Sequence, residues 1–388
     1  MKTKRICPAC GNNDGEAIYT IKMAIPPEIK LDDEYDIVSC NRCGCCYADT
    51  GATAEAYNDY YSNHNYYSGG LQCNGTNRYD ANVICRILDQ YIKKDDLVID
   101  IGCGNGNLLA YIKSFGFTNV CGIDPSKDSV DNLKKKNIPG FIGSIYDKPI
   151  EEVKKGKVVI FTMVLEHLLE PDKALKNIKD NYLDENGMVI VTWPHFEDLI
   201  SDGTPILNNF NHEHINYFSQ LTADILFNRC GFENLQHHTS TSVLIGDDVQ
   251  YSNISAYKIG DNCYDFCKDF KTKKSILEYV CRSIKKEKKI IEKINNLAKN
   301  QEDVVIWGTG SFFMHLIKVS DLLKCNIRGI VDNNELKHGQ SYMGYTISSP
   351  NILEDYSGTI VIAVMLYGNP IREQIKRICI NHCEIISV

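Results

Sequence analysis

The sequence lacks any apolar run long enough to cross a membrane. Its longest apolar stretch, residues 359–366, has the length of a strand, whereas a membrane-spanning helix needs roughly 20 apolar residues. The N-terminus opens with Lys2, Lys4 and Arg5, but no apolar segment follows them, so a secretory signal is not expected. These absences favour a cytoplasmic protein that does not associate with membranes.

An excess of basic residues is missing as well. The chain has 42 Lys and Arg against 50 Asp and Glu, which gives a net charge of −8 at pH 7. Proteins that bind nucleic acids gain much of their affinity by neutralising phosphates, so this balance favours a small-molecule substrate and no nucleic acid partner.

The chain has 388 residues, which is more than a single hydrophobic core usually contains. This length indicates two or three domains.

The 17 cysteines predict thiols and metal ligands, because no secretory signal precedes them. Two CxxC pairs, each followed by glycine, have the spacing of a zinc ribbon. The predicted ligands are Cys7, Cys10, Cys40 and Cys43. Either Cys45 or Cys46 could replace Cys43 as the fourth ligand. The zinc is expected to be structural, since four thiolates leave no open coordination position for catalysis.

The pattern along the chain predicts five segments. They are a zinc ribbon over 1–50, a tyrosine-rich lid or connecting segment over 51–78, an α/β domain over 79–260, a linker helix over 261–300 and a second α/β domain over 301–388. In the first α/β domain, strand-like runs at 97–101, 119–123, 158–161 and 188–192 alternate with helix-period segments. Such alternation predicts a parallel sheet with helices on both faces.

A glycine-rich loop follows the first of these strands. Its GxGxG spacing lacks the late glycine of the dinucleotide fingerprint GxGxxG. Asp124 closes the next strand, where a carboxylate can accept both ribose hydroxyls of an adenosyl group. Asp147 lies before the run at 158–161, after a further short strand, and can accept a bond from an adenine amino group. The candidate cofactor-binding residues are Asp100, Gly102, Gly104, Gly106, Asp124 and Asp147.

These motifs, with the segments 164–171 and 187–194, carry a family resemblance. Residues 79–260 resemble the class I S-adenosylmethionine-dependent methyltransferases. The resemblance implies a seven-stranded, doubly wound, Rossmann-like α/β sheet and S-adenosylmethionine as the methyl donor.

A candidate general base lies between the fifth strand and the next helix, in the run Asn211-His212-Glu213-His214. Methyl transfer often requires loss of a proton from the acceptor, and histidine is the usual base near neutral pH. This run, with the ribbon and the C-terminal domain, resembles nucleotide-sugar C-methyltransferases of deoxysugar pathways.

This second resemblance implies roles for single residues. His214 is the base, Glu213 orients it or the substrate, and His167 lies across the pocket. The expected substrate contacts are His212 and a tyrosine that closes over the sugar, Tyr66 or Tyr67. Asn211 stands where the family has a tyrosine, so carbon and oxygen acceptors both stay open.

The C-terminal domain has a second glycine loop, Gly308-Thr-Gly310, followed by Asp332. Because the loop has only two glycines, a bound NAD is not expected. The resemblance implies that this domain helps to hold the nucleotide-sugar, with Lys337 or His338 near its phosphates.

Other functions remain open from the sequence. One is O-methylation of another small metabolite or of a glycan, and another is RNA methylation, which the acidic balance disfavours. A different class is a non-catalytic scaffold that binds partners. The intact loop at 100–106 with Asp124 argues against the scaffold, because an inert core has no need of those residues.

Overall fold

The computed structural model describes residues 1–64, 78–199, 209–245, 248–260, 266–365 and 368–387. The chain divides into two compact units. The first comprises Met1–Ile18, Ile37–Asp202 and Glu213–Ile276, and the second comprises Tyr19–Asp36, Gly203–His212 and Leu277–Val388. Among the helices in these described parts, none is long and apolar enough to span a membrane.

The first unit is built on a seven-stranded sheet with the order β10-β11-β8-β7-β4-β5-β6. Only β11 runs antiparallel to its neighbours, and the other pairs are parallel. The strands are β4 (Val98–Ile101), β5 (Val120–Asp124), β6 (Gly140–Ile142), β7 (Gly156–Thr162), β8 (Leu183–Pro194), β10 (Phe232–Ile245) and β11 (Asp248–Ile259). The central strands are runs of buried aliphatic residues, as expected where both faces of a parallel sheet are covered.

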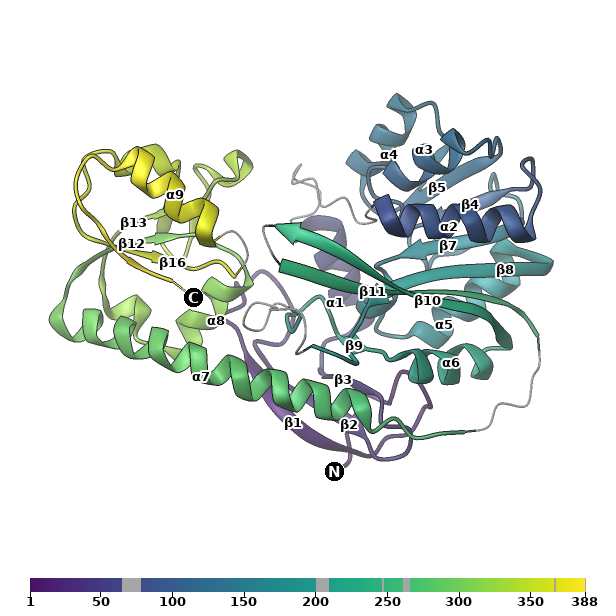
Figure 1. The fold of residues 1–388 in the computed structure, drawn as a ribbon, viewed down its shortest axis with the longest axis horizontal. Helices are drawn as coiled ribbons and strands as arrows, with labels where there is room; N and C mark the ends of the chain where they lie inside the picture. Colours follow the sequence, from purple (N-terminus) through teal and green to yellow (C-terminus); the bar gives the residue numbers. More distant parts are fainter. Residues whose placement is uncertain (65–77, 200–208, 246–247, 261–265, 366–367, 388) are drawn as a thin grey trace. The chain divides into compact units, whose positions relative to one another are not determined.

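Helices cover both faces of this sheet (Figure 1). One core cluster joins the sheet to α2 (Arg78–Tyr91), α3 (Asn107–Ser114) and α4 (Lys127–Lys135). A second cluster on the other face includes α5 (Pro171–Asn177), its π-helical continuation η4 (Ile178–Tyr182) and α6 (Gln220–Arg229). The predicted seven-stranded, doubly wound α/β fold is therefore confirmed.

A four-stranded sheet with the order β1-β2-β3-β9 carries the cysteine knuckles. Its strands are β1 (Gly15–Lys22), β2 (Glu34–Cys40), β3 (Cys46–Asp49) and β9 (Asn216–Tyr217). The pairing of β3 with β9 attaches the N-terminal segment to the chain just after Glu213 and His214. The helix α1 (Ala54–Asp59) follows, with Thr53 accepting from the backbone N–H of Ala56 at its start, and continues into η1 (Tyr60–His64).

The second unit contains a six-stranded sheet with the order β14-β15-β13-β12-β16-β17. The strands are β12 (Asp303–Trp307), β13 (Asn326–Val331), β14 (Ser341–Tyr342), β15 (Tyr345–Ser348), β16 (Thr359–Ile362) and β17 (Glu384–Ile386). The helices are α7 (Lys271–Asn300), which starts in the first unit, α8 (Ser311–Val319), α9 (Gly368–Ile378) and the short η5 (Leu322–Lys324), η6 (Glu335–Lys337) and η7 (Pro350–Leu353). The predicted second α/β domain is confirmed by this sheet.

The loop between the two cysteine knuckles does not belong wholly to the ribbon. Residues 19–36 are part of the second unit, where the backbone N–H of Ala24 donates to the carbonyl of Met314 over 2.8 Å. The CxxC spacing could not indicate this, because it constrains only the two ends of the loop.

Candidate functional site

The glycine loop connects β4 to α3 through three residues with left-handed backbone. Gly102, Gly104 and Gly106 have φ of 75°, 49° and 69°, values that L side chains rarely adopt. A Cβ at Gly102 would lie 2.7 Å from Val164, and one at Gly106 would lie 2.4 Å from Leu133. A Cβ at Gly104 would meet no atom within 4 Å. The loop therefore packs tightly on two sides and opens at its middle glycine, where a ligand can approach the backbone.

Two buried carboxylates lie beside this loop. Asp124, at the end of β5, accepts from the backbone N–H groups of Gly104 and Ser126, each over 2.9 Å. Asp100, at 1% exposure, has one oxygen without a hydrogen-bond partner among the described residues. Its burial, together with the nearby Asp124, raises the pKa of Asp100 to about 8. A buried carboxylate of this kind favours a cationic ligand group.

Asp147 is placed near the same end of the sheet, but its role in the structure is local. It is exposed, and its carboxylate accepts from the backbone N–H of Ser144 over 2.6 Å, closing the turn after β6. A contact with the adenine amino group would therefore use carboxylate lone pairs that do not accept from the N–H of Ser144.

The candidate catalytic histidines lie next to each other. His167 ends the 3-10 helix η3 (Leu165–His167), which follows β7, and its ring centroid lies 4.9 Å from that of His214. The Nδ1 atom of His167 lies 3.0 Å from the backbone carbonyl oxygen of Glu213. In the tautomer that donates from Nδ1 to this carbonyl, Nε2 carries the lone pair of the neutral ring.

Two tyrosines of the tyrosine-rich segment contact this cluster. Tyr60 donates to the carboxylate of Glu213, and the hydroxyl of Tyr61 lies 3.0 Å from Nδ1 of His167. Both come from η1, within the tyrosine-rich segment. Tyr66 and Tyr67 lie outside the described residues. The high tyrosine content of the segment indicated that it could contribute to the site, but it did not indicate which tyrosines contact the histidines.

His212 is buried, and the boundary between the two compact units falls directly after it. In the second unit, Lys337 is buried and its ammonium lies 3.3 Å from the carboxylate of Asp332 and 3.1 Å from the Thr309 hydroxyl. Its charge is therefore balanced within the domain, next to the second glycine loop. His338 contacts the backbone carbonyl of Asp332 over 2.7 Å.

The four cysteines predicted as metal ligands form one buried cluster. The sulfurs of Cys7 and Cys43 lie 3.5 Å apart, and those of Cys10 and Cys40 lie 3.6 Å apart. Tetrahedral zinc with Zn–S bonds of about 2.3 Å places its sulfurs roughly 3.8 Å apart, so the cluster fits zinc. Cys45, one of the two alternatives to Cys43, is directed at the carbonyl of Cys46 instead.

Arg5 connects this cluster to the histidines, and nothing in the sequence indicated it. Its guanidinium is buried and donates to backbone carbonyls that flank His167 and His214. These carbonyls belong to Leu168 (3.1 Å), Leu169 (2.8 Å) and Ile215 (3.1 Å). A further bond runs to the side-chain oxygen of Asn216 over 2.7 Å. Arg5 stands two residues before Cys7, so the ribbon holds both loops of the candidate site.

Replacing Arg5 with methionine is expected to destabilise the protein by about 3 kcal/mol or more, because several buried carbonyls lose a charged donor at once. The matched control is Arg42→Met, at an exposed position of the same ribbon. Chemical denaturation of the two variants measures the difference. Equal free energies of unfolding for the two variants would show that the Arg5 bonds do not hold the loops.

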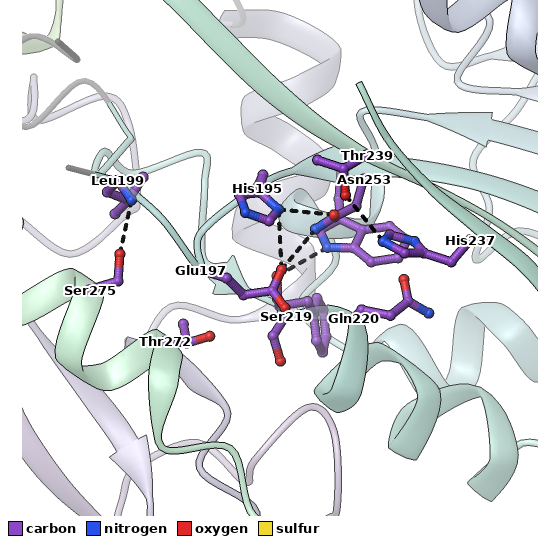
Figure 2. A network of polar contacts seen from close by, with 12 residues as sticks. His195, Glu197, Leu199, Ser219, Gln220, His237, Thr239, Asn253, Thr272 and Ser275 are labelled. Atoms are coloured by element: carbon purple, nitrogen blue, oxygen red, sulfur yellow. Dashed lines mark hydrogen bonds and ion pairs between the residues drawn. The ribbon is translucent and has the colours of Figure 1, made fainter. Parts of the chain in front are cut away.

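A second histidine–carboxylate pair lies at the carboxyl end of β8 (Figure 2). Nδ1 of His195 lies 3.2 Å from the carboxylate of Glu197 and 3.0 Å from the side-chain oxygen of Asn253 on β11. The amide nitrogen of Asn253 is 3.5 Å from Glu197. Sequence reasoning did not predict this group of three residues, because Asn253 lies 58 positions from His195. It adds polar side chains to the sheet edge that carries the glycine loop.

Parts of the chain are similar to known proteins. Residues 76–237 match the family model of the methyltransferase domain, and residues 300–386 match that of the "C2185-like, N-terminal" domain. An uncharacterized methyltransferase of Schizosaccharomyces pombe is 32% identical over 104 residues, covering 23% of this chain and 37% of that protein. An uncharacterized methyltransferase of Alkaliphilus oremlandii is 28% identical over 125 residues, covering 31% of this chain and 56% of that protein.

The chain spans less than two thirds of the length of these curated relatives.

Among solved structures, magnesium protoporphyrin IX methyltransferase from Synechocystis, with bound SAH, has a TM-score of 0.38 and 18% identity, covering 53% of this chain and 99% of that one. A putative methyltransferase from Bacillus halodurans has a TM-score of 0.38 and 12% identity, covering 47% and 99%. The strand order, the glycine loop and the match over 76–237 together show that this part of the chain has the fold of a methyltransferase domain.

Proposed function

We propose that this chain transfers the methyl group of S-adenosylmethionine to a small-molecule acceptor from which His214 removes a proton. The observation that carries this proposal is the cluster of His214, His167 and Glu213 with two tyrosines. It follows β7 and β8, at the carboxyl edge where open α/β sheets bind ligands. When bound, S-adenosylmethionine supplies a methyl group already activated on a sulfonium, so the chain has to position the acceptor and manage its proton.

The residues that would hold the cofactor surround the glycine loop. Asp100 pairs with its amino group, Gly104 allows its close approach to the backbone, and Asp124 accepts from the ribose hydroxyls. Asp147 is the proposed contact of the adenine. The unpartnered oxygen of Asp100 and the open space at Gly104 support this placement.

The proposed acceptor is a sugar carried as a nucleotide diphosphate, methylated on carbon or oxygen. Support comes from the His-Glu-His run, from the zinc-ribbon and C-terminal α/β units that accompany the methyltransferase domain, and from the net charge of −8. In this arrangement Glu213, held by Tyr60, orients the acceptor or His214. The protein is proposed to work in the cytoplasm, without nucleic acid or membrane partners.

Replacing His214 with glutamine is expected to lower kcat by about 100-fold or more, since loss of a general base typically costs that much. The affinity for S-adenosylhomocysteine should stay unchanged, because His214 is not placed at the cofactor loop. The control is His238→Gln, at an exposed position on β10. Full turnover of the His214 variant on its true substrate would exclude it as the base.

The substrate is found by a binding screen of thymidine- and guanosine-diphosphate sugars, with and without S-adenosylhomocysteine. The proposal predicts that at least one of them binds more tightly when the cofactor product is present. Solvent deuterium entering at a carbon beside a keto group, without cofactor, would indicate carbon as the acceptor. Absence of this exchange in a sugar that is methylated would indicate oxygen.

A further inference from the structure

A buried glutamate lies directly beside the two histidines. Glu166, in the middle of η3, has an exposed fraction of 0%, and neither of its carboxylate oxygens has a hydrogen-bond partner among the described residues. Its backbone carbonyl accepts from the N–H of Ile215 over 2.9 Å, which fixes it against the His214 loop. A carboxylate removed from water normally pairs with a cation or coordinates a metal. Among the described residues, the Glu166 carboxylate therefore makes no hydrogen bond, and its ion pair is a long contact with His167.

The basic nitrogen of His167 faces this carboxylate. Nε2 of His167 lies 3.8 Å from Oε1 of Glu166, which is too long for a hydrogen bond. The other ring nitrogen is fixed by the carbonyl of Glu213. Metal-ligating histidines typically have this arrangement, in which one nitrogen donates to a carbonyl or carboxylate and the other binds the ion.

His214 supplies a third potential ligand from a different loop. One ligand atom from each of Glu166, His167 and His214 lies within 4.8 Å of the other two. Such a span is small enough for a single ion to contact all three after slight side-chain adjustment, because metal–ligand distances are about 2.0–2.2 Å. The three residues come from the segments after β7 and before β9, both of which Arg5 holds.

We propose that Glu166, His167 and His214 bind one divalent transition-metal ion. Two imidazoles and one carboxylate suit first-row ions such as Zn²⁺, Co²⁺ or Fe²⁺, whereas Mg²⁺ and Ca²⁺ prefer oxygen ligands. The site is separate from the cysteine cluster, and its three protein ligands leave coordination positions open.

Ion binding and proton removal compete for His214. An imidazole whose lone pair coordinates an ion cannot accept a proton, so occupancy of this site blocks the proposed base. This consequence rests on the proposed function, whereas the binding of the ion does not. Added transition-metal ions are therefore expected to inhibit methyl transfer without affecting the binding of S-adenosylhomocysteine.

The test is a calorimetric titration of the full-length protein, with its cysteine cluster already loaded with zinc, using CoCl₂. The wild type should bind one additional Co²⁺ per chain and show visible absorption bands of Co²⁺ with nitrogen and oxygen ligands. Glu166→Gln keeps the size of the side chain and is expected to weaken this binding at least tenfold. Glu185→Gln, at an exposed position, should bind like the wild type.

Absence of the additional ion in the wild type, or its undiminished binding by Glu166→Gln, would overturn the proposal. Binding of S-adenosylhomocysteine is measured on the same samples and shows that each variant is folded. If the additional ion is absent while S-adenosylhomocysteine still binds, the metal proposal fails and the proposed methyl transfer stands. If S-adenosylhomocysteine does not bind while the ion does, the proposed function fails alone.

Discussion

Replacing Cys40 with serine is expected to abolish the proposed binding of zinc and to unfold the N-terminal ribbon, the largest effect that we predict for a single substitution. Structural zinc sites contribute on the order of 10 kcal/mol of apparent binding free energy, which is also folding free energy. Cys40 is fully buried, and its sulfur lies 3.6 Å from that of Cys10. A serine hydroxyl at this position is a poor zinc ligand and leaves three thiols that cannot close the tetrahedron.

The effect should extend to the candidate active site. The ribbon holds the segments around His167 and His214 through Arg5 and through the pairing of β3 with β9. Zinc content and thermal unfolding are measured together for Cys40→Ser and for the control Cys267→Ser, whose thiol is exposed. Stoichiometric zinc and an unchanged unfolding temperature in Cys40→Ser would rule out a zinc site at these cysteines.

Replacing Asp124 with alanine is expected to weaken the binding of S-adenosylhomocysteine by about 100-fold or more. Hydrogen bonds to a charged group each contribute about 1.5–3 kcal/mol, and Asp124 is the proposed acceptor for two ribose hydroxyls. Its carboxylate also accepts from the N–H of Gly104, so the substitution loosens the loop at its most open point. Both effects reduce the affinity.

Asp128→Ala is the matched control for this experiment, because Asp128 is exposed in the first turn of α4. Isothermal titration calorimetry gives both dissociation constants. Affinity in Asp124→Ala within threefold of the wild type would place the cofactor elsewhere.

The cofactor loop and the cysteine cluster could be predicted because their residues are close together in sequence and have fixed spacing. Gly102, Gly104 and Gly106 require left-handed backbone that glycine readily adopts, and Asp124 follows at the end of the next strand. The two CxxC pairs similarly specify a tetrahedral thiolate cluster. In such motifs the local chain determines the geometry, so the residue pattern is sufficient.

The rest of the site depends on contacts between distant segments, which a single sequence does not specify. Tyr60 meets Glu213 over 153 positions, and Arg5 meets Leu169 over 164. Glu166 was part of a recognised motif, but its complete burial and the bond from the Ile215 N–H to its carbonyl could not be read from that motif. The sequence therefore indicated His167, Glu213 and His214 as candidates, but not the contacts that Tyr60 and Arg5 make around them.

The most direct test of the proposed function is methyl transfer itself. The full-length protein is incubated with S-adenosylmethionine that carries a deuterated methyl group and with a panel of nucleotide-diphosphate sugars. The masses of the products are then measured by mass spectrometry. We predict that the label appears in one or more of these sugars with the wild type and not with Asp124→Ala. Label that appears equally with both proteins, or in none of the sugars while S-adenosylmethionine is bound, would contradict the proposed function.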